Sequence, residues 1–394
     1  MFGSFSSECS RVEYDARPMR RISRIIAAGL SAITLLSTRS ASATDEDLPS
    51  GDDPPRLVPI VSVDGYYAYH DTPPSSGNAT FATTAVRHNE FQLNLVSVGA
   101  RVEHAKLLGA LILQAGTAAD VLYAPPPSRS PNANPDTWKH IQEAHVGYRI
   151  GSDVAVEAGL FPSHIGNEGF TSFGNWNYSR AMISDATPYY LAGVKAKWSA
   201  SPTFALTALV YNGWQGLQDA NKYKSGGLRV DWTPSDKIAV FDAISVGPET
   251  GDDREIRYFD DLVVSLALHP RVSVAAEGYV GLDRGKDKTR DAGFWGAAAW
   301  IRWLVGETTY FAVRGERLVD TAGLLTDCGA RAPCARGDGQ KLLGGTLTLG
   351  WFPHPMLLAR AEGVHRRADR AFFAAGNGAE DRSTTFVTSL VFSY

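Results

Sequence analysis

The end of the chain alternates between apolar and polar positions. Between Arg382 and Tyr394, the apolar residues Phe386, Leu390 and Phe392 share one parity with Tyr394, and small or polar residues take most of the other. A period of two is typical of a β-strand with one apolar face. The alternation reaches an aromatic last residue, as in a strand that pairs with the first strand of a membrane barrel and leaves no edge in lipid. We therefore expect this strand to close a barrel.

The same strand character recurs along the chain from Leu57 onward. Most of the stretches are about as long as a tilted strand needs to be to cross a bilayer, or slightly longer. Sixteen stretches are found, at 57–69, 89–103, 107–117, 139–149, 153–161, 187–198, 203–213, 223–233, 236–246, 257–268, 271–282, 292–304, 307–318, 341–352, 355–365 and 383–394.

The connections between these stretches alternate strictly in length. Seven are tight turns, at 105–106, 151–152, 200–202, 234–235, 269–270, 305–306 and 353–354. Eight are long polar loops, at 70–88, 118–138, 162–186, 214–222, 247–256, 283–291, 319–340 and 366–382. Short periplasmic turns and long external loops are typical of an outer-membrane barrel. A soluble propeller would instead need about four strands per blade and a motif for each blade, and none is visible. The pattern predicts an all-β fold, a single transmembrane antiparallel up-and-down barrel of about sixteen strands.

Aromatic residues recur at one level of the predicted barrel. Trp198, Trp232, Trp303 and Trp351 each lie just before a short turn, and Phe352 and Tyr394 lie at the same level. Amphipathic rings favour the interface between membrane and water, so this level predicts a girdle at the periplasmic side. Ordinary core tryptophans are the alternative.

The amino-terminal part of the chain has the pattern of a signal peptide. Arg20, Arg21 and Arg24 precede an apolar run from Ile25 to Leu36, and Ala41-Ser42-Ala43 supplies small residues for cleavage. We expect residues 1–43 to be an upstream extension and a cleaved signal peptide, with Met19 as the true start. Residues 44–56 are acidic and rich in proline, which predicts a disordered periplasmic linker before a barrel at 57–394. A different targeting peptide or a buried helix is the alternative for the first segment.

Charge and cysteine content narrow the class further. The first 43 residues hold six Arg and three acids, so the remaining chain has 32 basic and 39 acidic residues, which argues against a nucleic-acid partner. No segment after residue 43 has the roughly 18 unbroken apolar residues of a membrane helix. Cys9 would be lost with the signal peptide, and Cys328 and Cys334 predict a local disulfide in an exported protein. Two cysteines without nearby histidine make a poor metal site, and we expect no metal.

Charged residues within the strands alternate with apolar ones. A basic side chain facing lipid at mid-depth costs roughly 2–4 kcal/mol, so we expect the charges to face the interior. A barrel of sixteen strands is too wide for side chains to fill, which predicts a water-filled pore. The near balance of bases and acids predicts weak ion selectivity, with simple wall salt bridges as the alternative for adjacent pairs. The predicted pore-lining residues are Arg101, Glu103, Glu143, Arg149, Glu157, Lys195, Lys197, Arg229, Asp231, Asp242, Asp261, Glu277, Arg302, Arg314, Glu316, Arg360 and Glu362; His145 lies on one of these strands.

The long loop from Pro162 to Ala186 is dense in glycine, asparagine and aromatic residues. Loops of this length are usually functional or disordered, and its aromatic residues argue against disorder. We expect it to fold into the barrel as a constriction loop. An external lid or a contact with a neighbouring barrel is the alternative. Its candidate polar contacts are Glu168, Asn175, Asn177, Arg180 and Asp185.

Several short motifs resemble the OmpL-like family of β-barrel porins. The most specific is N-W-N-Y-S-R at 175–180, followed by P-Y-Y at 188–190; further matches lie at 64–69, 91–95, 211–214 and 232–237. The resemblance spans about Leu57 to Tyr394 and implies a porin-like protein of the bacterial outer membrane. The loop with Cys328 and Cys334 departs from the family pattern.

No catalytic or cofactor motif is present. The sequence lacks H-E-x-x-H and a phosphate-binding loop, and a hydrolase built on His140, His145 and nearby serines has little support. We expect a protein that is not an enzyme and has no cofactor. It is predicted to be a porin for passive diffusion of small hydrophilic solutes or ions. A plugged structural or surface-binding barrel that acts through its external loops is the alternative. The expected partners are outer-membrane lipid, the solutes, the barrel assembly machinery through the carboxy-terminal strand, and further copies in a homotrimer.

Overall fold

The computed structural model describes residues 52–74, 77–123, 138–217, 223–249, 255–284, 291–326 and 339–394. The predicted signal peptide and the Cys328–Cys334 disulfide lie outside these residues and stay predictions. So does most of the predicted linker.

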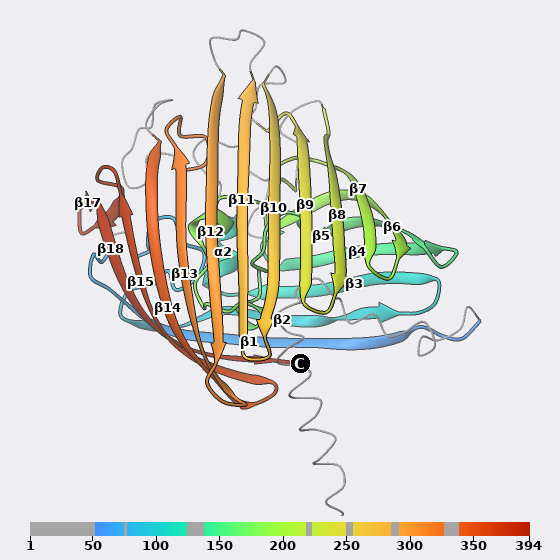
Figure 1. Ribbon diagram of the computed structural model, residues 1–394, viewed down its shortest axis with the longest axis horizontal. Coiled ribbons are helices and arrows are strands. Elements are labelled where there is room, and N and C mark those ends of the chain that lie inside the picture. The colour runs from blue at the N-terminus through green and yellow to red at the C-terminus, as the bar shows by residue number, and fades with distance from the viewer. Residues whose placement is uncertain are drawn as a thin grey trace, which may run out of the picture.

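Within the described residues, sixteen antiparallel strands form a closed barrel in which sequence neighbours pair, so the predicted fold class is confirmed. Figure 1 shows the strands of the near and far walls crossing in projection, because both walls are tilted. The barrel strands are β1 (Arg56–His70), β2 (Glu90–Glu103), β3 (Leu107–Ala115), β4 (Ile141–Ile150), β5 (Val154–Pro162), β6 (Tyr190–Ser201), β7 (Phe204–Tyr211), β8 (Ser225–Ser235), β9 (Ile238–Gly247), β10 (Ile256–His269), β11 (Val272–Arg284), β12 (Ala292–Leu304), β13 (Thr309–Asp320), β14 (Gln340–His354), β15 (Leu357–Ala368) and β18 (Arg382–Ser393).

The last strand closes the barrel as expected. β18 pairs with β15 on one side and with β1 on the other, in a register that runs from Ser62 opposite Ser393 to His70 opposite Thr385. Val61 and Tyr394 exchange backbone hydrogen bonds of 3.0 and 2.8 Å. No edge of the sheet is therefore left unpaired in the membrane.

Short elements lie in the connections between the barrel strands. A helix, α2 (Thr117–Tyr123), follows β3, and a hairpin of β16 (Phe373–Ala375) and β17 (Gly378–Glu380) lies between β15 and β18. The 3-10 turn η2 (Ser172–Gly174) and the short helix α4 (Met182–Asp185) belong to the segment between β5 and β6. Of the helices in the described ranges, none has the length and apolar character needed to cross a membrane.

The predicted girdle lies on the outer face of the barrel. Trp198, Trp232, Trp303 and Trp351 are each about half exposed on the outward side of their strands. Phe352 corrects the prediction, because it follows Trp351 and so takes the opposite face. It is buried inside the barrel, where its ring meets Phe173 edge-on at 6.0 Å between centroids.

Asp242 also corrects the prediction, because it faces outward. On β9 the buried inward positions are Phe241, Ala243 and Ser245, while Asp242 lies between the outward residues of neighbouring strands, opposite Leu262. Both faces of β9 are apolar, so alternation alone does not distinguish them. A carboxyl group facing lipid also costs less than an arginine or lysine.

Candidate functional site

Residues 162–186, which run from the end of β5 toward β6, lie inside the barrel. We call them the interior loop. Tyr178, Ala181, Met182 and Ile183 are fully buried. The apolar part around α4 packs against wall residues of β10 to β14 that include Phe259, Ala298, Trp300, Leu318 and Leu342. Burial of these side chains supplies the hydrophobic part of the attachment, at about 1.5–3 kcal/mol for each large side chain.

Small residues of the wall make room for the loop. A Cβ atom added to Gly344 on β14 would lie 2.9 Å from the Cε atom of Met182, and one added to Gly296 on β12 would lie 2.9 Å from Ile183 Cγ2. Glycine at these two inward positions therefore permits the close approach of α4.

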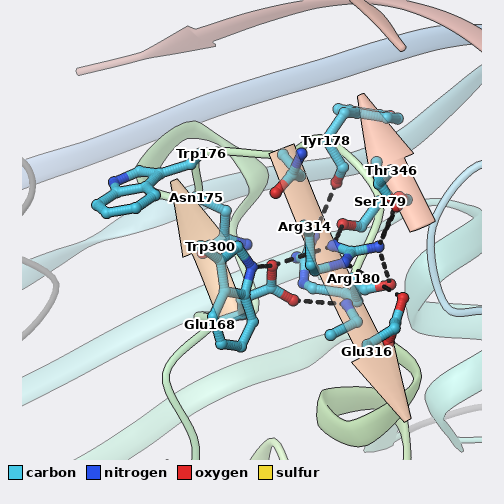
Figure 2. Close-up of polar contacts among 12 residues, drawn as sticks. Glu168, Asn175, Trp176, Tyr178, Ser179, Arg180, Trp300, Arg314, Glu316 and Thr346 are labelled. Carbon is cyan, nitrogen blue, oxygen red and sulfur yellow. Dashed lines mark hydrogen bonds and ion pairs between the residues drawn. The ribbon is translucent and has the colours of Figure 1, made fainter. Parts of the chain in front are cut away.

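Arg314 is the centre of the polar attachment (Figure 2). Its guanidinium group donates hydrogen bonds to the carbonyl oxygens of Ser179 at 2.7 Å and Arg180 at 3.2 Å. The same group contacts Glu168 Oε1 and Glu316 Oε1, both at 3.2 Å. Both carboxylates also accept bonds from the loop itself: Glu168 from the backbone N–H of Ala181 at 2.6 Å, and Glu316 from that of Met182. A buried charge that is paired and hydrogen-bonded in this way is held in one geometry.

Glu362 on β15 and Asp64 on β1 anchor the next part of the loop. The backbone N–H groups of Tyr178 and Ser179 donate to Glu362 at 2.6 and 2.9 Å. The hydroxyl groups of Tyr178 and Ser172 donate to Asp64 at 2.8 and 2.7 Å. Burial, and next the charge of Asp64, raise the pKa of Tyr178 well above its usual value, so the phenol stays a donor.

Two further arginines bind carbonyl oxygens of the loop. Arg360 Nη2 donates to Ser172 at 2.6 Å and to Asn175 at 3.0 Å. Arg366 Nη2 donates to the carbonyl oxygen of Arg180 at 3.0 Å. Charge-assisted hydrogen bonds to backbone carbonyl groups hold the backbone of the loop in place and do not depend on the side chains at these positions.

The first residues of the loop attach to β8 to β11. Gly166 N–H donates to Asp261 at 2.8 Å, and Asn167 N–H donates to Glu277 at 3.1 Å. The His164 Nε2 atom lies 3.2 Å from the carbonyl oxygen of Ile244, and Arg229 Nη1 donates to the His164 carbonyl at 2.7 Å. Burial lowers the pKa of His164 to about 4.

The predicted loop residues contact the wall or the loop itself. Glu168, Asn175, Asn177 and Arg180 are buried; Asn175 bonds to Gly169 and Asn177 to Thr348. Asp185 accepts hydrogen bonds from Thr83 at 2.5 Å and Tyr189 at 2.9 Å, and burial raises its pKa.

Apart from Asp242, the other predicted residues face the interior and fall into two groups by exposure. The interior loop covers the first group, whose members are all almost fully buried: Asp261, Glu277, Arg302, Arg314, Glu316, Arg360 and Glu362. The second group lies on β2 to β8 and is at least partly exposed apart from Glu143: Arg101, Glu103, Glu143, Arg149, Glu157, Lys195, Lys197, Arg229 and Asp231. The side chain of Arg314 is 0% exposed and that of Arg101 is 50% exposed, so the two groups differ in their access to solvent.

The acids of the second group are all paired. Arg101 binds Glu143 at 2.7 Å, Lys195 binds Glu157 at 3.2 Å and Arg229 binds Asp231 at 2.8 Å. Arg56 binds Glu103, and His145 lies 2.9 Å from Glu157. Within the described residues, neither Arg149 nor Lys197 has an acidic partner. They share one row of the inner face, because both pair with Ala155.

A closed barrel of sixteen strands, with a long loop packed on its inner wall and charges along the remaining wall, has the architecture of a porin. Residues 61–394 match the family described as "Putative beta-barrel porin-2, OmpL-like". The chain belongs to this family and is a protein of the bacterial outer membrane. No curated protein matches the sequence significantly.

Solved structures support the fold. An anion-selective porin from Comamonas acidovorans superposes with a TM-score of 0.56 at 10% identity, over 86% of this chain and 100% of that one. The channel DcaP of Acinetobacter baumannii gives 0.57 at 9%, over 88% and 99%. OmpT of Vibrio cholerae in its trimer form gives 0.55 at 9%, over 87% and 100%. At these identities the likeness concerns the fold alone.

Proposed function

We propose that the protein is a passive channel for small hydrophilic solutes, and that they pass between the interior loop and the wall formed by β2 to β8. The observation that carries the proposal is the one-sided filling of the barrel. The loop covers the predicted inward charges of β10 to β15, whereas those of β2 to β8 keep access to solvent apart from Glu143. Charged side chains that stay exposed inside a wide barrel are expected to border water.

The passage should favour anions. Its acids are neutralised by neighbouring bases, and Arg149 and Lys197 add positive charge that no described acid balances. A low-dielectric wall focuses such a field into the water beside it. One solved structure with this fold is an anion-selective porin, but the proposal rests on the pairing of charges in this chain.

The interior loop would act as the constriction. The polar residues of the loop bind the wall or the loop itself and do not face the passage. The loop therefore narrows the passage by its volume and not by its charges. Because Arg314, Glu362 and Asp64 fix it at several points, we expect the narrowed passage to have a constant width.

Planar-bilayer conductance of refolded residues 44–394 tests the proposal. Stable current steps of porin size, with a reversal potential that shows anion preference under a salt gradient, are expected. Arg149→Glu combined with Lys197→Glu should shift the preference toward cations. Arg317→Glu combined with Arg367→Glu reverses the same charge on the outer face of the barrel and should leave it unchanged. A folded, heat-modifiable barrel without conductance would overturn the channel proposal.

A plugged barrel is the alternative function, and the extensive burial of the interior loop favours it. In that case the external loops would carry the activity, and the bilayer experiment would find no current. Homotrimeric association and recognition of β18 by an assembly machinery stay predictions for this chain, the first of which chemical crosslinking in membranes would test.

A further inference from the structure

Four basic residues form a row on the outer face of the barrel. Arg317 on β13 lies opposite Leu343 on β14, Leu343 lies opposite Arg367 on β15, and Arg367 lies opposite Arg382 on β18. Lys341 is two residues from Leu343 and so shares its face. The four strands are neighbours in the barrel and lie together at the left of Figure 1.

These side chains differ from the arginines inside the barrel. Arg317, Lys341, Arg367 and Arg382 are all exposed, and across the described residues none makes an ion pair or a side-chain hydrogen bond. Arg314, in contrast, is bonded on every side. Acids lie within two residues of these bases in sequence, among them Asp369, Glu380 and Asp381. Asp369 accepts a bond from the backbone N–H of Lys341 rather than from its ammonium group.

The row lies at the outer boundary of the hydrocarbon layer. Two outward tryptophans on β12, Trp295 and Trp303, are separated by roughly 26 Å along the strand at about 3.3 Å per residue. Because barrel strands tilt by about 35–45°, the two rings differ in height by about 20 Å, within the roughly 25 Å apolar band of a membrane barrel. Arg317 lies opposite Ala297, one pleat from Trp295, and therefore close to the level of that tryptophan at the end with the long loops.

The remaining members of the row lie at the same level or farther out. Trp303 lies opposite Phe311, but Trp351 on the next strand lies opposite Thr309. From β12 to β14, the periplasmic tryptophans therefore move two residues toward the periplasm relative to the rows of paired residues. Because these tryptophans mark one level of the membrane, a row of paired residues comes closer to the outer surface in the same direction. Arg367 and Arg382 consequently reach the level of lipid headgroups.

Unpaired cations at this level require anions from the surroundings. Adjacent strands are about 4.8 Å apart, so Arg317 and Arg367, two strands apart, span about 10 Å. The guanidinium fork suits phosphate oxygens, and basic residues near a membrane surface favour anionic headgroups. Below the row, the outward residues Leu347, Leu349 and Val313 offer an apolar surface for acyl chains.

We propose that Arg317, Lys341, Arg367 and Arg382 form a binding site for the phosphate groups of a glycolipid in the outer leaflet. The site holds lipid against β13 to β18, away from the interior. It does not depend on whether the barrel conducts.

Native mass spectrometry of the refolded protein tests the site with bisphosphorylated lipid A as the probe. Replacing all four residues by glutamine should weaken binding by roughly tenfold or more, because it removes the four positive charges that attract the phosphate groups of the lipid. Lys237→Gln with Arg271→Gln, in turns at the opposite end, should bind as the unchanged protein does. The double variant Arg317→Gln with Arg367→Gln provides a milder change in case the fourfold variant folds poorly.

Two further probes separate the source of the phosphate. Lipid A stripped of its phosphates should bind the unchanged protein as weakly as bisphosphorylated lipid A binds the fourfold variant, and inorganic phosphate should not compete at equal concentration. Equal binding of lipid A by the fourfold variant, equal binding of the dephosphorylated lipid, or full competition by inorganic phosphate would each overturn the proposal.

Discussion

Arg314 on β13 donates a hydrogen bond of 2.7 Å to the carbonyl oxygen of Ser179, which lies in the middle of the interior loop. This bond joins the barrel wall to a segment that begins about 150 residues earlier in the chain. Both partners are buried. The same guanidinium group balances Glu168 from the loop and Glu316 from the wall, so one side chain links two carboxylates and two backbone carbonyl groups.

Replacement of Arg314 should therefore release the loop. Arg314→Met leaves Glu168 and Glu316 buried without a cation, and loss of one member of such a cluster costs about 3–5 kcal/mol. Urea unfolding in lipid vesicles should show this loss. Arg271→Met, in an exposed turn, removes the same charge and should change the midpoint little. Equal stability of the two variants would mean that Arg314 does not hold the loop.

Gly344 and Gly345 offer a matched pair of substitutions for the fit of α4. Gly344→Val would force its side chain against Met182 and should cost about 1–3 kcal/mol. Displacement of the loop should also make single-channel currents noisier or larger. A Cβ atom at the outward Gly345 meets nothing within 4 Å, so Gly345→Val should leave the currents unchanged. Identical recordings from both variants would contradict the packing described for α4.

His164 predicts a dependence of stability on pH. Its pKa is about 4 in the folded protein and 6.5 as an ordinary histidine, so the unfolded state binds more protons between these values. The contribution of His164 is therefore complete above pH 6.5 and falls as the pH decreases toward 4. The urea midpoint should fall less over this range in His164→Gln.

Comparison of the two proteins isolates this effect. The raised pKa of Asp185 acts in the opposite direction, because protonation of a buried carboxyl group at low pH relieves its desolvation. That contribution is common to both proteins and cancels in their difference. Parallel pH profiles would show that His164 is not buried in the neutral form.

The outward acids Asp242 and Asp260 predict a gain of stability on substitution. They lie on the membrane face of β9 and β10, opposite the apolar residues Leu262 and Ile244. Asp242→Val with Asp260→Val should stabilise the barrel in vesicles by about 1–2 kcal/mol, since carboxyl groups are costly in lipid although less so than arginine. Asp236→Val, in a turn, should have no such effect. A loss of stability instead would contradict the placement of these two carboxyl groups against lipid.

The barrel could be predicted from the sequence because its two strongest signals are local. Alternation identified the strands and their faces at Arg314 and Glu316, and the lengths of the connections identified the two ends. The rule failed at Asp242 because both faces of β9 are apolar. Phe352 was placed in the girdle from its level in the membrane alone, although alternation puts it on the face opposite to Trp351.

The attachment of the loop could be predicted only in part. Its composition indicated that it folds into the barrel, and several of its polar residues were named. The sequence did not indicate that Asp64, Tyr310 and Thr348 bind the loop, because their role depends on which strands the loop meets after closure. The division of interior charges into covered and accessible groups could not be predicted for the same reason. A count of bases and acids therefore did not show that, in the described part of the chain, Arg149 and Lys197 have no acidic partner.

The seam between β1 and β18 has a consequence for the order of folding. It joins positions such as Ser62 and Phe392, 330 residues apart, whereas the other pairings join strands that follow one another. The entropic cost of closing a loop grows with its length, so local hairpins should form before the seam. Until then the chain is an open sheet with two exposed edges, vulnerable to pairing with other chains. Weakening the seam would therefore slow assembly and promote aggregation before it altered the finished barrel.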